Sequence, residues 1–196
     1  MARELQKSRT RKDLLRAAAK LMRDGGSPSF EAIAEEAMVS RATAYRYFPG
    51  LDALLVEAAL DMAAPAPQLL MGEGAPADLA GRLEFVDDAF DSMIRTHETP
   101  LRTMLVHALQ RRLRGEDELP VRQNRRMPMI EAAIGDSDAA LSRDAAERLA
   151  RAAAMIVGTE SMVVAKDVLA IPDDAAREVR RWALRALAAA AKAEAR

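Results

Sequence analysis

The stretch FEAIAEEAMVSRATAYRYF, residues 30–48, decides the fold of the N-terminal part of this chain. Its first half places Ile33 and Ala34 on the apolar face of an acidic, helical pattern. Its second half has no acidic residue and carries two arginines and two tyrosines within seven residues. We therefore expect the first half to be scaffold and the second half to be presented to a grooved, negatively charged partner.

Two serines predict where the helices of this stretch begin. Ser29 precedes the first segment and Ser40 precedes the second, and serine is a preferred N-cap residue. A tight turn is expected at residues 38–40, with Val39 filling the space between the two helices. With the helix before them, these segments predict a helix-turn-helix over about residues 29–48.

Composition favours a helical protein that meets a polyanion at one end. The 196 residues are 50% hydrophobic but only 4% aromatic, and alanine, leucine, arginine and glutamate are abundant. Residues 1–50 carry a net charge of +4 and residues 51–196 a net charge of −5. The absence of cysteine excludes disulfides and thiolate metal sites. No signal peptide or membrane span is predicted, so we expect a cytoplasmic protein.

The rest of the chain also has helical patterning. Thr10 is the predicted start of the first helix, and residues 63–76 form a linker rich in proline, glycine and alanine. Ser142 or Asp144 is expected to begin a long helix that continues to about residue 168. The predicted fold class is therefore all-α, with an N-terminal three-helix domain joined to a C-terminal helical domain.

The segment FEAIAEEAMVSRATAYRYFPGLDALL resembles the DNA-binding segment of the TetR/AcrR family of bacterial transcriptional repressors. The resemblance covers about residues 8–60, and the matching positions are Ile33, Ala34, Ala37, Val39, Ser40, Thr43, Tyr45 and Phe48. It implies a helix-turn-helix DNA-binding domain at residues 8–56 and a ligand-binding and dimerisation domain at residues 57–196. The implied function is a repressor that a small-molecule ligand releases from its operator.

Two positions depart from the family pattern. Met38 stands where the family usually has glycine, at a helix end whose backbone is often left-handed and strained for other residues. Leu51 stands where the family commonly has a lysine that contacts a DNA phosphate. One phosphate contact is thus missing, or is replaced by Arg41, Arg46 and the basic N-terminus.

By this resemblance, the third helix lies in the major groove of an operator. Arg41 and Thr43 are candidates for base edges, because arginine suits guanine and the threonine methyl suits thymine. The tyrosine hydroxyls and the remaining cation would contact phosphates. The predicted DNA-binding set is Ser29, Ser40, Arg41, Thr43, Tyr45, Arg46 and Tyr47. The alternatives are a core position for Tyr47 and a plain surface role for Arg41.

The resemblance also implies a homodimer, which we expect to form through the last two long helices. These carry small side chains that allow close helix packing, namely Ala152, Ala153, Ile156, Val163, Ala183, Ala186, Leu187 and Ala190. The candidates for an adaptable ligand pocket are Phe90, Met93, Met104, His107, Met127, Met129, Met155 and Met162. Ordinary core packing is the alternative for each of them. The ligand itself is not specified.

Two other classes of function compete with this interpretation. An enzyme is not indicated, because the chain has two histidines and no metalloprotease, nucleophile-elbow or phosphate-loop motif. No cofactor and no metal are therefore expected. A helical protein-interaction module with lost or weak DNA binding is the closer alternative, to which Met38 and Leu51 lend support.

Overall fold

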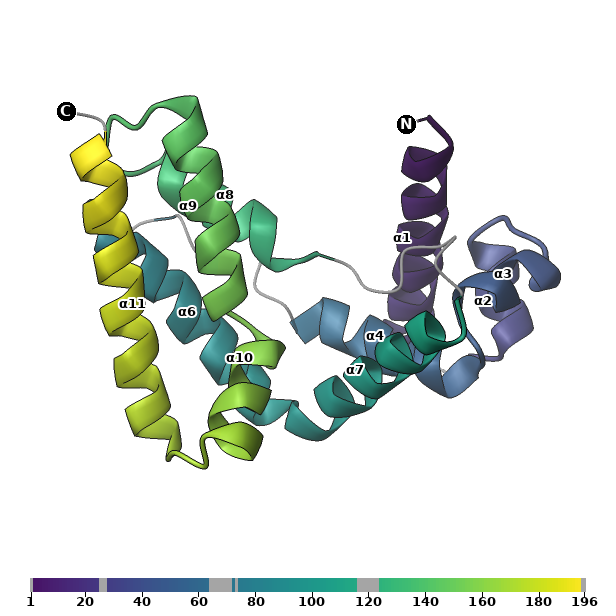
Figure 1. Cartoon of the computed structure of the whole chain (residues 1–196). Coiled ribbons are helices and arrows are strands. Elements are labelled where there is room, and N and C mark those ends of the chain that lie inside the picture. The colour runs from purple at the N-terminus through teal and green to yellow at the C-terminus, as the bar shows by residue number, and fades with distance from the viewer. Residues whose placement is uncertain (1, 25–27, 64–71, 73, 116–123, 195–196) are drawn as a thin grey trace. The chain divides into compact units, whose positions relative to one another are not determined.

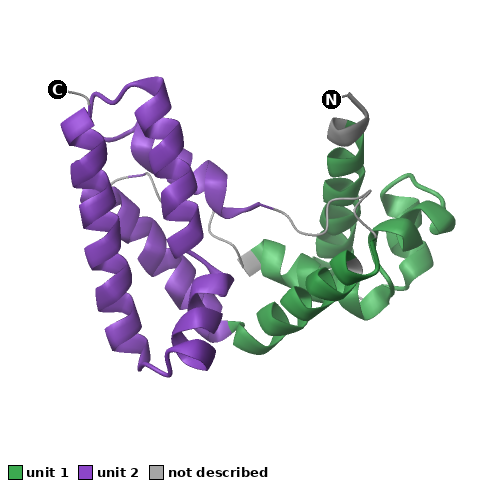
Figure 2. Cartoon of the chain, viewed as in Figure 1, with its two compact units in different colours: residues 1–63, 97–123 green, residues 64–96, 124–196 purple. Residues whose placement is uncertain are grey.

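The chain is helical and forms two compact units. A computed structural model describes residues 2–24, 28–63, 72, 74–115 and 124–194, and within these ranges it contains helices and no strand. The predicted all-α class is confirmed. None of the described helices has the length and apolar character needed to cross a membrane. Figure 2 colours unit 1, residues 1–63 and 97–123, separately from unit 2, residues 64–96 and 124–196.

Unit 1 joins the N-terminal helices to a helix from much later in the chain. Its helices are α1 (Ala2–Arg23), α2 (Phe30–Glu36), α3 (Arg41–Tyr47), α4 (Leu51–Ala63) and α7 (Glu98–Leu113), labelled in Figure 1. Helix α1 packs mainly against α4, and α7 also packs against α4. By contacts, α7 therefore belongs with the N-terminal helices. The functional assignment of residues 8–56 and 57–196 stays a prediction.

The first helix begins earlier than its sequence indicated. It runs from Ala2, and Thr10 lies inside it, where its hydroxyl donates to the Gln6 carbonyl at 3.1 Å. The prediction that Thr10 starts this helix is wrong. The residues before Thr10 include arginine, glutamate, leucine, glutamine and lysine, which are strong helix formers, so the helix extends through them.

The core of unit 1 holds the three N-terminal helices and α4 together. Ile33 and Ala34 are buried, as their spacing predicted. The largest fully buried side chains include Leu14 and Leu15 from α1 and Leu54 from α4. Since these residues face one another across α1 and α4, they fix the platform on which α2 and α3 stand.

Unit 2 is built around α6 and α11. Its elements are α6 (Leu79–Thr96), α8 (Arg126–Gly135), α9 (Arg143–Ile156), α10 (Thr159–Val163), the π-helical turn Val164–Val168 and α11 (Asp173–Glu194). Helix α11 packs against both α6 and α9, and α8 packs against both α6 and α9. In Figure 1, α9 and α11 run side by side. Phe90 and Leu184 lie in this interior.

The long helix predicted from residue 142 is interrupted. Ser142 caps α9 as predicted, but the helix ends at Ile156, so the prediction that it continues to about residue 168 is wrong. Gly158 has φ 129°, a conformation that side chains disfavour. The Arg126 guanidinium donates to the carbonyls of Ala154 and Val157, both at 2.9 Å, and thereby satisfies the end of α9.

A buried ion cluster fastens α6 to α11. Arg180 donates to both Asp87 carboxylate oxygens at 3.0 Å and to Asp91 at 2.6 Å. Arg177 donates to the other oxygen of Asp91 at 2.8 Å. Asp87 is 1% exposed and Arg180 is 9% exposed, so these charges depend on one another for solvation.

The two carboxylates of this cluster respond differently to their surroundings. Burial raises the pKa of Asp87 above its ordinary value, and the facing Arg180 guanidinium offsets part of that effect. For Asp91, burial also acts to raise the pKa, but the hydrogen bonds and charges of Arg177 and Arg180 outweigh it, so its pKa is lowered. Asp91 therefore stabilises the fold in its ionised form, and Arg180 is what makes an ionised Asp87 tolerable.

Replacing Arg180 with methionine is expected to destabilise the protein by about 3 kcal/mol at pH 7, because the buried Asp87 carboxylate loses its ion-pair partner and Asp91 keeps only Arg177 and Arg95. Without the Arg180 cation, the folded-state pKa of Asp87 rises further. The loss of stability caused by the variant is therefore full at pH values above the raised pKa of Asp87. It disappears as acidification protonates the Asp87 carboxyl group. Urea denaturation at pH 7 and pH 5 should therefore show a smaller difference from the wild type at pH 5.

The control for this variant is Arg185→Met, on the same helix. Arg185 donates to Glu84 at 2.9 Å, but its side chain is 56% exposed. Loss of this exposed pair should change the free energy of unfolding by less than about 1 kcal/mol. If the two variants lost equal stability, or if the cost of Arg180→Met did not depend on pH, the buried cluster would not have the role assigned to it.

Candidate nucleic-acid interface

The turn between α2 and α3 is tight and closed by backbone hydrogen bonds. Met38 has φ 54°, so its backbone takes the left-handed conformation that is common at this position, a point that the sequence left open. The Val39 amide donates to the Ala34 carbonyl at 2.9 Å, and the Met38 amide donates to Glu35 at 2.9 Å. Val39 packs against the core, as predicted, while the Met38 side chain is 92% exposed. The turn therefore holds its geometry despite the missing glycine.

Serine hydroxyls begin both helices, as predicted. Ser29 accepts a hydrogen bond from the Ala32 amide and Ser40 accepts one from the Thr43 amide, both at 3.1 Å. The hydroxyls of Ser40 and Thr43 also lie 2.8 Å apart and share a hydrogen bond. Because the threonine hydroxyl is held toward the cap, the orientation of the whole Thr43 side chain is set before any partner arrives.

Helix α3 has one buried face and one exposed face. Ala44 and Tyr47 are buried, whereas Arg41, Tyr45 and Arg46 are exposed. The small Ala44 side chain, which is 0% exposed, lets α3 approach the rest of the core closely. The exposed face of α3 therefore carries two guanidinium groups and the Tyr45 hydroxyl, while the opposite face of the helix packs against the core.

A stack of side chains organises the exposed face. The Tyr45 ring lies on the Phe30 ring with 4.2 Å between centroids, and the Arg41 guanidinium lies 5.6 Å from the Tyr45 centroid. Glu31, in the first turn of α2, pairs with Arg41 at 3.0 Å. Both partners are more than half exposed, so this pair contributes little stability. It does orient Arg41, and it competes with any negative partner that approaches.

Tyr47 occupies a different position from the other predicted contacts. Only 5% of the residue is exposed, and it belongs to the core cluster of unit 1. A buried ring cannot lie along a DNA backbone, so we remove Tyr47 from the set of phosphate contacts. The alternative interpretation, that Tyr47 is a core residue, is the one that its burial supports.

Leu51 is also part of the core. It begins α4 and packs, half-buried, against the same cluster. The position where a lysine would reach a phosphate is therefore used for packing in this chain. The exposed cations of the unit include Arg41 and Arg46 of α3 and Lys12 and Arg16 of α1.

Arg11 holds the C-terminal end of α3 in place, and the sequence analysis did not identify this residue. It is 3% exposed, donates to the Tyr47 carbonyl at 3.0 Å and is ion-paired with the buried Glu57 of α4. Its guanidinium also lies 4.2 Å from the centroid of the Phe48 ring. One side chain therefore connects α1, the end of α3 and α4. The signal was present, because Arg11 lies on the same helical face as Leu14 and Leu15.

The predicted ligand-binding residues are divided between the two units. Met104 and His107 line a cavity in unit 1 together with Glu57. The remaining predicted residues lie in unit 2: Phe90 and Met129 are buried, as is Met162, while Met93 and Met127 are half-buried. Met155 is 82% exposed, so it is not part of an enclosed pocket within one chain. The ligand-binding role of these residues stays a prediction.

The geometry defines a class of protein before any comparison is made. A four-residue turn closed by a serine cap, a short helix with exposed arginines after it and a packed core behind it are the geometry of a helix-turn-helix DNA-binding domain. Residues 14–58 match the family model described as bacterial regulatory proteins, tetR family. Residues 14–58 are therefore a DNA-binding domain of the tetR-family type, which supports a DNA-binding transcriptional regulator. A comparison with curated proteins finds no match.

The role of Arg41 is tested by two substitutions with opposite effects. Arg41→Ala is expected to weaken binding to specific DNA about tenfold, because a good arginine–guanine contact contributes about 1–3 kcal/mol. Glu31→Gln is expected to strengthen it about two- to fivefold, since it frees Arg41 and removes a negative charge. Fluorescence anisotropy with a labelled duplex at fixed salt measures both effects.

The matched control is Arg16→Ala, which removes an exposed cation from α1. It should change binding to specific and to unrelated DNA by the same small factor, since it can only contribute a general electrostatic term. If Glu31→Gln weakened binding as much as Arg41→Ala does, Glu31 would be a supporting residue for the DNA-bound arginine and not its competitor.

Proposed function

We propose that this regulator is a homodimeric repressor that binds an operator through α3 and is released by a small-molecule ligand. The observation that carries the proposal is the exposed face of α3, where Arg41, Tyr45 and Arg46 stand clear of the core. The buried Arg11–Glu57 pair holds that face rigidly. A rigid, cationic helix face is what major-groove recognition requires.

Each exposed side chain has an assigned role in this proposal. Arg41 reads guanine, and the Thr43 methyl contacts thymine. The Tyr45 hydroxyl and Arg46 contact phosphates, and they are supported by Ser29 and Ser40 at the starts of α2 and α3. The Ser29 oxygen accepts from the Ala32 amide, so its hydroxyl hydrogen is directed elsewhere and can be donated to a phosphate. The proposal involves no catalysis, cofactor or metal.

Dimerisation is proposed to occur through α9 and α11. A stripe of exposed apolar side chains follows α11 at alternating spacings of three and four residues, namely Val179, Trp182, Ala186, Ala189 and Ala193. Trp182 is 68% exposed and Met155 of the neighbouring α9 is 82% exposed. Exposed apolar surface of this extent, at coiled-coil spacing, favours a helical interface between two copies. A dimer also places two α3 helices on one operator.

The alternative is a protein-interaction module with weak DNA binding. It is favoured by Leu51, which takes the place of a phosphate-binding lysine, and by the exposed Met38 at the turn. The distinction is quantitative, because an interaction module would bind DNA without a steep salt dependence. Since a DNA-binding regulator works where chromosomal DNA lies, the proposal includes a cytoplasmic location.

A gel-shift series with the DNA upstream of the protein's own gene tests the proposed function. Specific binding should weaken steeply with salt, with a slope of log affinity against log salt of roughly −3 to −5, because several phosphates are neutralised. An unrelated duplex of equal length is the control and should bind much more weakly at the same salt. Equal binding to both duplexes would favour the interaction module and contradict an operator-binding repressor.

The proposed dimer interface is tested by Trp182→Glu. A charge in the middle of an apolar helical interface should convert the dimer to a monomer at micromolar concentration, as measured by analytical ultracentrifugation. Operator affinity should fall at least tenfold, because one half-site no longer supports the other.

The control is Leu113→Glu on α7, where the side chain is 87% exposed but lies outside the proposed interface. This variant should remain dimeric. A wild-type protein that sedimented as a monomer at these concentrations would overturn the dimer proposal.

A further inference from the structure

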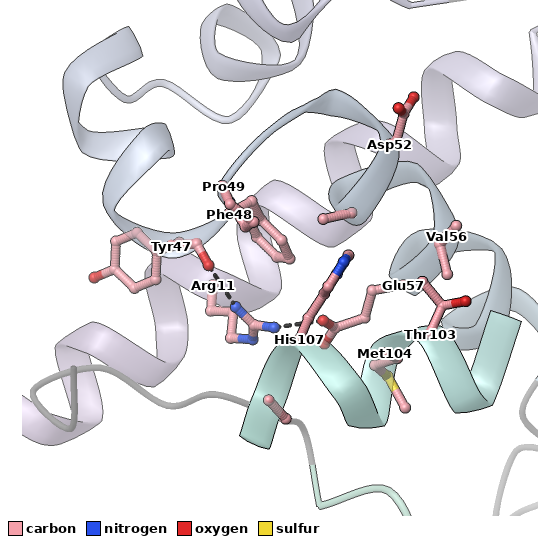
Figure 3. Close-up of a pocket in the computed structure, with 12 residues that line it drawn as sticks. Arg11, Tyr47, Phe48, Pro49, Asp52, Val56, Glu57, Thr103, Met104 and His107 are labelled. Carbon is pink, nitrogen blue, oxygen red and sulfur yellow. Dashed lines mark hydrogen bonds and ion pairs between the residues drawn. The ribbon is translucent and has the colours of Figure 1, made fainter. Parts of the chain in front are cut away.

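A cavity of about 70 Å³ lies within unit 1, between α4 and α7. Its apolar walls are formed by Phe48 and Pro49, which directly follow α3, by Ala53 and Val56 of α4, and by Met104 and Ala108 of α7. Figure 3 shows these elements around the open space, with the Arg11–Glu57 pair at one side. The cavity therefore adjoins the end of the recognition helix.

The polar groups on the cavity wall favour an uncharged occupant. Arg11 and Glu57 are buried and ion-paired with each other, so their charges largely cancel. Among the described residues, His107 has no hydrogen-bond partner, and its half-buried ring rises from α7 toward α4 (Figure 3). Thr103, the neighbouring polar residue on the wall, already donates to the Thr99 carbonyl at 3.0 Å. Asp52 also lines the cavity, but its side chain is exposed to solvent, so His107 is the half-buried polar group with capacity for a ligand.

The size of the cavity limits the occupant to a small molecule. At roughly 10–15 Å³ of such space for each water-sized group, it accommodates about five to seven non-hydrogen atoms. Apolar walls, a small volume and one unsatisfied imidazole together describe a compact apolar molecule with one hydroxyl group, for which phenol is a suitable probe.

We propose that this cavity is a regulatory site for a compact, uncharged, mostly apolar hydroxyl compound, and that its occupation weakens DNA binding. The hydroxyl group hydrogen-bonds to His107, and the apolar body fills the space between α4 and α7. This inference rests on the proposed function, because it places the controlling ligand inside the DNA-binding unit.

The coupling to DNA follows from the contacts that the cavity adjoins. The Tyr47 carbonyl, at the end of α3, is held by Arg11, and Arg11 is held by Glu57 on the cavity wall. Phe48 lies under the Arg11 guanidinium and also lines the cavity. A guest that displaces Phe48 or competes for Glu57 therefore loosens the end of α3. A state with a loosened α3 binds the ligand better and DNA less well, as linkage requires.

Ligand-detected NMR of phenol with the full chain tests binding without DNA. Saturable binding with a dissociation constant on the order of 1 mM or tighter is expected for a guest of this size. Ala108→Leu fills the cavity and should abolish binding, and His107→Leu should weaken it several-fold through the lost hydrogen bond. The matched control, Val106→Leu, adds a carbon to the exposed side of α7 and should bind phenol normally.

Circular dichroism establishes that each variant is folded. The fold should tolerate His107→Leu more easily than Ala108→Leu, because the His107 side chain is half-buried and the Ala108 side chain is buried. Absence of saturable phenol binding to the wild type would overturn the site. Equal binding to the wild type, Ala108→Leu and His107→Leu would do the same, since phenol would then bind elsewhere.

Anisotropy of a labelled operator duplex tests the regulatory part. Saturating phenol should weaken operator binding about five- to tenfold in the wild type and in Val106→Leu, within the usual range of coupling between two sites. It should have no effect in Ala108→Leu. Phenol binding with unchanged operator affinity would overturn the regulatory role. Failure to bind any operator, with phenol binding intact, would contradict the proposed function and leave the ligand site standing.

Discussion

The buried ion pair between Arg11 and Glu57 is the interaction on which the DNA-binding unit depends. It joins the first helix to α4 and, through the Tyr47 carbonyl, to the end of α3. Removing one partner would leave an uncompensated buried charge, at a cost of about 3–5 kcal/mol. The exposed face of α3 can therefore consist of polar side chains with few contacts of their own, because its position is set from behind by residues that never meet DNA.

Unit 2 uses the same physical device for a different purpose. Two buried carboxylates of α6 face Arg177 and Arg180 of α11, and their charges are acceptable only because they are paired. A shift of α11 by one turn along α6 would leave a buried charge without a partner. The position of α11 along α6 is thereby fixed, and with it the exposed stripe that contains Trp182.

Local signals in the sequence were read correctly where they act over a few residues. Ser29 and Ser40 cap their helices, because a cap depends only on neighbouring backbone groups. The predicted helix bounds were wrong where other residues outweighed the local signal. Thr10 resembles a cap but lies within a longer run of helix formers, and the apolar pattern after Ser142 does not show that Gly158 breaks the helix.

By itself, the sequence determined the helical class, the helix-turn-helix and the residues that make up α3, because periodicity and capping are local properties of the chain. Only the tertiary structure decided which of those residues face inward. It placed Tyr47 in the core, brought α7 back to the N-terminal helices and put His107 beside the Arg11–Glu57 pair. These contacts join residues far apart in the chain, and they are set by how whole helices pack, which no short window of sequence contains.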